Sequence, residues 1–218
     1  MSFTRGDVRA DVQRRLEEFN TTVVTDSDLD QEFLYALLDI EQKIDFRELM
    51  DSDTTSLDTV VDQQEYTLPT TNGVIRKMID LTISNVHYEE VDFLQKDNLQ
   101  GSQNSVNIGD VAMAGNAYYL YGTTTIGFVP IPSAVADIKF YFYKFHPTVS
   151  DDTTALSLPD IVREAIVTRM AASVMKTDET IPNATITNEM NEYERLVGNA
   201  RQFISNSSRM KIGNFTNY

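Results

Sequence analysis

Few side chains in this sequence of 218 residues have the chemistry of a catalytic site. His87 and His146 are the only imidazoles, and neither has a second histidine at metal-ligand spacing. There is no HExxH motif, no GxSxG motif and no phosphate-binding glycine loop. Because the chain has no cysteine, it has no thiolate nucleophile and no disulfide. We interpret both histidines as structural or surface residues.

Two groups of carboxylates have the oxygen ligands that a divalent cation prefers. Asp151 and Asp152 are adjacent, and Asp26, Asp28 and Asp30 alternate along the chain. The alternating group lacks the glycine and the terminal glutamate of a calcium-binding loop. We interpret it as charges in the first turn of a helix, and the adjacent pair as part of a loop that leads into a helix. The sequence therefore predicts no metal site, no cofactor and no enzymatic activity.

Acidic side chains are in large surplus. The chain has 33 acidic and 18 basic residues, which gives a net charge of −15. Duplex DNA is bound by Lys and Arg side chains that displace counterions from its phosphates, so this balance argues against ordinary DNA binding. No apolar run approaches the roughly 20 residues that cross a bilayer, and we predict no membrane contact.

The acidity is concentrated in one segment. Between Asp26 and Glu65 there are thirteen carboxylates but only two basic residues, Lys43 and Arg47. One interpretation is a solvated helix face followed by an acidic loop. The other is a surface that repels an anionic partner. The candidate residues for this acidic surface are Asp26, Asp28, Asp30, Asp39, Glu41, Asp45 and Glu48.

Apolar residues recur at helical spacing in two N-terminal segments. The first helix is predicted over residues 4–19, and we expect its four arginines to be solvated. The second is predicted from a capping Ser27 to about residue 50. Its apolar stripe comprises Leu29, Phe33, Leu37, Ile40 and Ile44.

A region of β-type sequence follows a polar connector at residues 51–56. Strands are predicted around residues 63–69, 74–86 and 89–94, and a hairpin over residues 118–145 is interrupted by Gly122 and by prolines. The polar residues 96–109 are interpreted as a long loop. The last strand, over 138–145, has aromatic residues on both faces, so we expect it to be covered on both sides.

Helical spacing returns after residue 151. Leu158 and Pro159 precede a helix that is expected to be buried on two sides, with Val162, Ile166, Met170 and Val174 at intervals of four. A final helix, capped by Thr187, carries a heptad-like seam. The seam comprises Met190, Tyr193, Val197, Ala200 and Ile204.

The segregation of helices and strands predicts an α+β fold. We expect a four-helix bundle with an inserted antiparallel β-sandwich or barrel domain. Residues 1–56 and 151–205 would form the two halves of the bundle, residues 57–150 the insertion, and residues 206–218 an extended C-terminal tail. This tail is polar and basic with scattered apolar residues, a composition typical of a segment that orders on a partner.

Three short motifs occur in order along the β region and the helix that follows it. A Q-x-Y-x-L-P strand opening is present at Gln64, Tyr66, Leu68 and Pro69. An I-x-F-x-P-x-P strand is present at Ile126, Phe128, Pro130 and Pro132. An L-P helix start follows at Leu158 and Pro159. In their order and spacing these motifs resemble those of the head-to-tail adaptor (connector) proteins of tailed bacteriophages, and the resemblance extends over most of the chain.

The resemblance implies a structural virion protein at the head-tail neck, assembled in the host cytoplasm. Such a protein binds beneath the portal protein as a ring, usually of twelve copies, and meets a downstream tail, nozzle or stopper protein. Genomic DNA would pass through its channel without sequence-specific binding, and the acidic surface would repel that DNA. The tail would dock on the portal through Arg209, Met210, Lys211, Ile212, Phe215 and Tyr218.

Three other functions are compatible with the sequence. A stopper or tail-completion protein is the nearest alternative within the virion. A carbohydrate- or receptor-binding β module would need solvent-facing aromatic residues, and this chain has no tryptophan for sugar stacking. A hydrolase would need two carboxylates that converge in a cleft.

Overall fold

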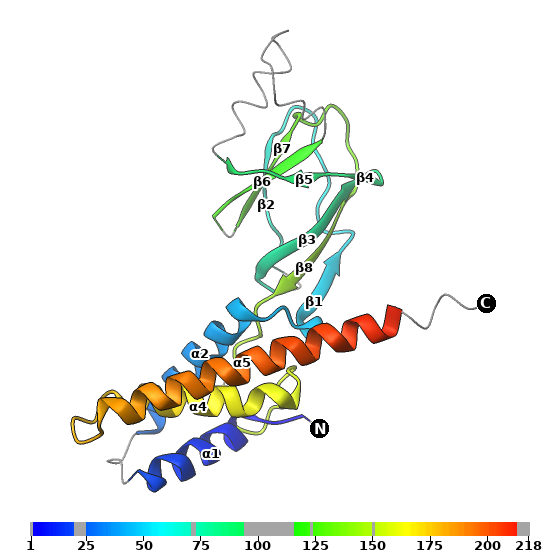
Figure 1. Cartoon of the computed structure of the whole chain (residues 1–218). Coiled ribbons are helices and arrows are strands. Elements are labelled where there is room, and N and C mark those ends of the chain that lie inside the picture. Colours follow the sequence, from blue (N-terminus) through cyan, green and yellow to red (C-terminus); the bar gives the residue numbers. More distant parts are fainter. Residues whose placement is uncertain are drawn as a thin grey trace, which may run out of the picture. The chain divides into compact units, whose positions relative to one another are not determined.

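The computed structural model describes residues 2–19, 25–70, 73–93, 116–122, 124–149 and 151–212, with side chains described to Asn206 (Figure 1). The predicted loop at 96–109 lies outside these residues. The chain divides into two compact units. We call Met1–Leu49 together with His146–Tyr218 the helical unit, and Met50–Phe145 the β unit. The fold is α+β, as predicted.

The helical unit is organised around α4 (Arg163–Met175), which packs against each of the other long helices. These are α1 (Arg5–Glu18), α2 (Asp26–Lys43) and α5 (Asn183–Ile212). Short 3-10 turns, η1 (Arg47–Leu49) and η3 (Asp160–Val162), follow α2 and precede α4. Because the other three helices each pack mainly on α4, the expected four-helix bundle is not confirmed.

Two capping boxes begin the N-terminal helices. The Thr4 side chain accepts the Asp7 N–H while the Asp7 carboxylate accepts the Thr4 N–H, and Thr25 and Asp28 do the same for α2. The predicted cap Ser27 is therefore wrong, because the box at Thr25 starts α2 at Asp26. Thr187 is also not a cap: α5 begins at Asn183, and the Thr187 hydroxyl donates to the Asn183 carbonyl within the helix.

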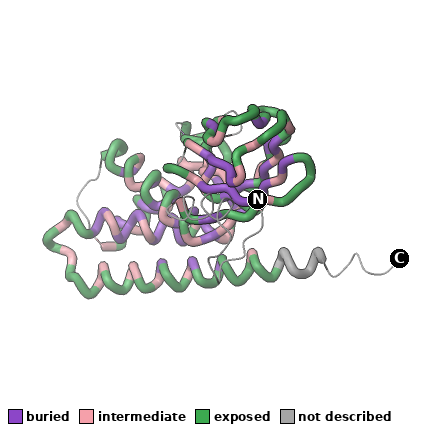
Figure 2. Tube along the Cα trace, turned by 90° about the horizontal axis from the view of Figure 1, so that it is seen from above, coloured by how far each residue is buried: buried purple, intermediate pink, exposed green. Residues whose placement is uncertain are grey.

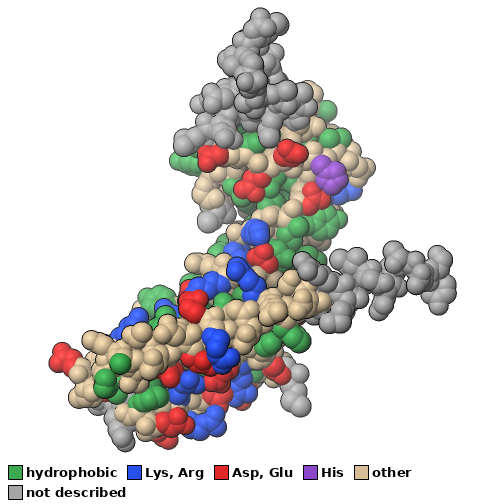
Figure 3. Space-filling view, viewed as in Figure 1, with side chains coloured by type: hydrophobic (Ala, Val, Ile, Leu, Met, Phe, Trp, Pro, Cys, Tyr) green, Lys and Arg blue, Asp and Glu red, His purple; other side chains and the backbone are tan. Residues whose placement is uncertain are grey.

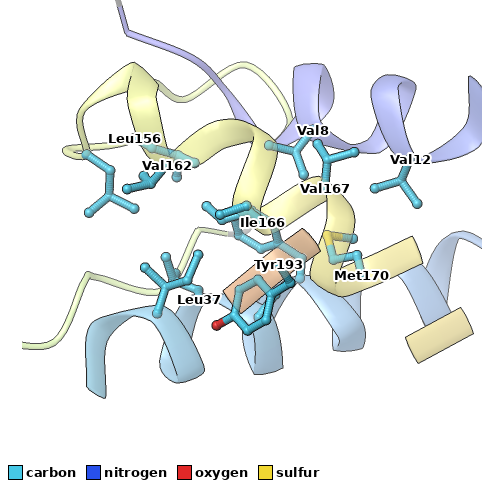
Figure 4. Close-up of a cluster of buried hydrophobic side chains, with 14 of the residues drawn as sticks. Val8, Val12, Leu37, Leu156, Val162, Ile166, Val167, Met170 and Tyr193 are labelled. Carbon is cyan, nitrogen blue, oxygen red and sulfur yellow. The ribbon is translucent and has the colours of Figure 1, made fainter. Parts of the chain in front are cut away.

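The predicted apolar stripes form the core of the helical unit. All five residues of the apolar stripe predicted for α2 are buried, as are Val8 and Val12 of α1 (Figure 4). Most of α4 is buried on both sides, as predicted. Buried positions recur at intervals along α5, where Tyr193 and Ala200 are fully enclosed (Figure 2). The 3.6-residue periodicity thus predicted the core-facing side of each helix.

The described residues of the β unit form two four-stranded sheets. One has the order β1-β8-β3-β4 and the other β2-β7-β6-β5. Within the described residues both sheets are open, so the barrel alternative is wrong. All pairs are antiparallel except β5 with β6, which is parallel. The strands are β1 (Met50–Asp53), β2 (Glu65–Thr67), β3 (Ile75–Ile83), β4 (Val86–His87), β5 (Glu89–Glu90), β6 (Ala117–Tyr121), β7 (Thr125–Val129) and β8 (Ile138–Lys144).

Both sheets contribute to one core in the β unit. Phe140 and Phe142 of β8 lie in it with Tyr66 of β2 and Phe128 of β7. The opposite face of β8 is not covered as predicted, because Tyr141 is 41% exposed. β1 was also missed, since its sequence MDSD has no apolar alternation and it becomes a strand by pairing with β8.

Candidate functional site

The two sequence motifs of the β unit are neighbours in space. Tyr66 of β2 is paired with Ile126 of β7, and the rings of Tyr66 and Phe128 lie 5.5 Å apart. The Tyr66 hydroxyl accepts the Val60 N–H, and its single proton is within reach of two carbonyl oxygens, Gln63 at 2.8 Å and Val60 at 3.1 Å. The motif tyrosine therefore holds the preceding loop against the sheet.

Three of the seven acidic candidates lie in the first turns of α2, and two of them form ion pairs. Arg9 is paired with Asp26, and both Arg5 and Arg9 approach Asp30. The same arginines also pair with Asp152, at 2.7 Å from Arg5 Nε and 2.8 Å from Arg9 Nη1. This cluster connects α1, the start of α2 and the loop before η3. The third residue, Asp28, forms the capping box of α2 with Thr25.

Asp39 is held in a second network between α2 and α5. Its carboxylate accepts hydrogen bonds from the Tyr193 hydroxyl at 2.8 Å and from Arg169 Nε at 3.2 Å, and Lys43 lies 3.5 Å away. Burial raises the pKa of Asp39, but these donors and cations outweigh it, so the pKa is lowered overall. The pKa of Tyr193 is raised by burial and by Asp39. Asp39 is therefore ionised and links three helices.

Glu41 is not part of an exposed acidic surface, which corrects one of the sequence assignments. It is 1% exposed, and its carboxylate accepts the His146 N–H at 2.9 Å. Glu48 is exposed and Asp45 is partly exposed. Acidic and basic side chains are interspersed over the helical unit (Figure 3). Of the seven acidic candidates, Asp26, Asp30 and Asp39 have arginine or lysine side chains beside them.

The six residues predicted to dock on the portal belong to the last part of α5 and to the residues that follow it. The helix continues to Ile212, past the point where the sequence was expected to become an extended tail. Residues 205–212 contain neither glycine nor proline, so the helix can propagate until Gly213. Arg209, Met210, Lys211 and Ile212 belong to this last part of α5, although their side chains lie outside the described residues, as do Phe215 and Tyr218 entirely.

His146 has a structural environment. Its ring Nε2 accepts the Ser157 N–H at 3.0 Å, and its Nδ1 lies 2.8 Å from the Pro147 carbonyl. The ring must be neutral to accept that N–H, and burial lowers its pKa. His87 is exposed, with Nδ1 3.0 Å from Asp80. His146 belongs to the helical unit and His87 to the β unit.

Asp151 and Asp152 do not form an acid-base pair. Asp151 accepts the N–H and hydroxyl of Thr153, and these hydrogen bonds lower its pKa. The pKa of Asp152 is also lowered, chiefly by Arg5. A general acid needs a raised pKa in order to hold its proton near neutral pH. These two carboxylates therefore have the properties of structural acceptors.

The exposed aromatic residues of the β unit do not form one stacking platform. Tyr141 lies on β8 in the first sheet, whereas Tyr121 lies on β6 in the second. Tyr121 is packed against Phe93, with 4.8 Å between the ring centroids. Among the described residues, no group of histidine and carboxylate side chains is arranged to hold a metal ion, and no helix is long and apolar enough to span a bilayer.

The sequence analysis did not predict the exposed apolar side of α2. Leu34, Tyr35 and Leu38 lie on the side of α2 opposite its buried stripe and are exposed. The signal was available in the spacing, because Leu38 follows Leu34 by four residues and Tyr35 by three, and both spacings place side chains on the same side of a helix. α2 thus has apolar residues on two opposite sides.

Comparison with known protein families gives a match over nearly the whole chain. A search of curated proteins found no match. The family model described as SU10 adaptor protein matches residues 3–212, which include all described helices and strands of both units. A match over this length includes the three motifs and both flanking helical segments. The chain therefore belongs to the SU10 adaptor protein family, a family of bacteriophage structural adaptors.

Proposed function

We propose that the protein is a head-to-tail adaptor that assembles as a ring beneath the portal and extends the DNA channel toward the tail. The observation that carries this proposal is the family match over residues 3–212. Twelve copies is the number that the resemblance to connector proteins implies. In this proposal the protein resides in the virion neck, binds the portal on one side and meets a tail, nozzle or stopper protein on the other.

The acidity of the chain suits a channel through which DNA slides. A net charge of −15 repels phosphate, whereas a binding surface would attract it. Among the acidic candidates, Glu48 is exposed and Asp45 is partly exposed, and these two would contribute to the repulsion. Asp26, Asp30 and Asp39 contribute less to the outward field because arginine and lysine lie beside them.

The end of α5 is the proposed portal-docking element. Between Arg195 and Tyr218 the chain has four basic residues and no carboxylate, in contrast to the acidic remainder. Met210 and Ile212 would add apolar contacts at the end of the helix, and Phe215 and Tyr218 would add them beyond it. A segment of this composition gains both charge and apolar contacts when a partner covers it.

Truncation tests the docking element. We expect that deletion of residues 206–218 abolishes co-purification with the portal protein of the same phage, while the thermal unfolding temperature changes little, because the core seam ends at Ile204. A shorter deletion of residues 213–218 is the matched control, since it leaves Arg209–Ile212 in place and measures the share of Phe215 and Tyr218. Full portal binding by the longer truncation would exclude this role for the tail.

A further inference from the structure

Polar contacts join the C-terminal end of α2 to the middle of α5. Lys43 is the last residue of α2, and its Nζ lies 2.7 Å from Glu194 Oε1 and 4.5 Å from the centre of the Tyr193 ring. In the opposite direction, Arg201 Nη2 donates a hydrogen bond to the Lys43 carbonyl at 2.8 Å. Carbonyls in the last turn of a helix lack an intrahelical partner, and the negative end of the helix dipole favours a cation beside them. Arg201 thus satisfies a carbonyl that α2 cannot satisfy itself.

These contacts lie on either side of Gly198, an interior position of α5. Glycine weakens a helix because its backbone loses more conformational freedom on folding than that of any other residue. Close packing does not require a glycine here, since a Cβ atom would meet nothing within 4 Å among the described residues. The contacts of Lys43 precede this weak position, whereas the contact of Arg201 follows it. The buried Ala200 and the partly buried Ile204 also hold the part of α5 after Gly198 on the core.

We infer that Arg201 is a positioning residue that fixes the direction of α5 beyond Gly198 and so presents the portal-docking element to its partner. The inference rests on the proposed docking of the end of α5. Apolar contacts allow small rotations, whereas a hydrogen bond from a guanidinium to a carbonyl is directional. Gly198 and Ile212 lie about 21 Å apart along the helix axis, so a small bend at Gly198 displaces the docking residues appreciably. An element that already has its bound direction loses less freedom on binding.

Charge-matched variants of the full-length chain test this role. Arg201→Gln removes the contact with α2, whereas Arg195→Gln removes the same charge from a residue that pairs with Glu192 within α5. We expect Arg201→Gln to bind the portal of the same phage about tenfold more weakly than the wild type, and Arg195→Gln to bind nearly as tightly as the wild type. Adding Gly198→Ala to Arg201→Gln should restore most of the binding, because alanine stiffens the helix at its weak position. Both arginines are exposed, so the melting temperatures should change little.

Amide hydrogen exchange of the isolated protein measures the positioning without the portal. In Arg201→Gln, the amides that follow Gly198 should exchange faster than in the wild type, because this part of α5 opens more often. Arg195→Gln should leave their exchange unchanged. Unchanged exchange in Arg201→Gln would overturn the inference.

The binding outcomes separate this inference from the proposed function. Wild-type portal binding by Arg201→Gln, or equal losses in Arg201→Gln and Arg195→Gln, would overturn the positioning role. A loss that Gly198→Ala does not restore would show that Arg201 contacts the portal itself, which also overturns it. A wild-type protein that does not bind the portal would contradict the proposed function and the docking part of this inference, whereas faster exchange in Arg201→Gln would still support the contact that holds α5.

Discussion

At the scale of single residues, the side chain of Tyr119 packs directly on Gly127 in the β unit. Gly127 of β7 is paired with Glu65 on one side and Tyr119 on the other. The buried Tyr119 ring crosses over Gly127, and its hydroxyl donates to Glu65 Oε1 at 2.9 Å. A Cβ atom at position 127 would clash with Cζ, Oη and Cε2 of Tyr119. The glycine is required for its lack of a side chain.

Gly127→Ala should therefore destabilise the protein by about 1–3 kcal/mol, because the Tyr119 ring must move and its hydrogen bond is lost. Urea unfolding measures the change. Gly198→Ala is the matched control: nothing lies within 4 Å of a Cβ at that helical position. It should be neutral or stabilise the protein by up to about 1 kcal/mol. Equal effects of the two variants would contradict the packing account.

His146 gives the protein a pH-dependent stability of known sign. Its pKa in the folded state is lowered by burial from the ordinary 6.5, so the unfolded chain binds the proton more readily. The stabilisation is present above pH 6.5 and is lost as the pH falls toward the lower folded value. We expect the unfolding free energy of the wild type to fall more steeply between pH 7 and pH 5 than that of His146→Gln. An equally steep fall in His146→Gln would contradict this account.

At the scale of elements, the two sides of α2 make a paired prediction. Ile40 is fully buried, and an aspartate there would place an unpaired charge in the core, so Ile40→Asp should unfold the helical unit. Leu38 is two residues earlier, on the exposed side of α2. Leu38→Asp should therefore leave the helical circular dichroism and the melting temperature of the isolated chain close to wild type. Loss of structure in both variants would mean that Leu38 also belongs to the core.

The sequence predicted helices better than it predicted their ends and partners. Periodicity placed the buried anchors of α2 and the seam of α5 correctly, because burial of one helix face imposes that spacing. It could not show that Arg5, Arg9 and Arg15, expected to be solvated, pair with acids brought near by the fold. Nor could it find β1, which becomes a strand only by pairing with a distant segment.

At the scale of the whole molecule, the candidate site was predicted only in outline. The family was recognised from three motifs, and two of them lie on adjacent strands. The acidic surface was predicted from the number of carboxylates in one segment. That number cannot distinguish Glu41, which is buried, from Glu48, which is exposed. The proposed portal-docking element lies at the end of α5, outside the strand motifs that carry the resemblance.

The central claim is that the chain is a ring-forming adaptor, and the mass of the assembled complex tests it most directly. Purified protein is measured alone and after mixing with the portal of the same phage, by native mass spectrometry or light scattering. The account predicts a portal complex that gains a full ring of adaptor copies, twelve by the family resemblance. A protein that stays monomeric in the presence of the portal and adds no mass to it would contradict the account.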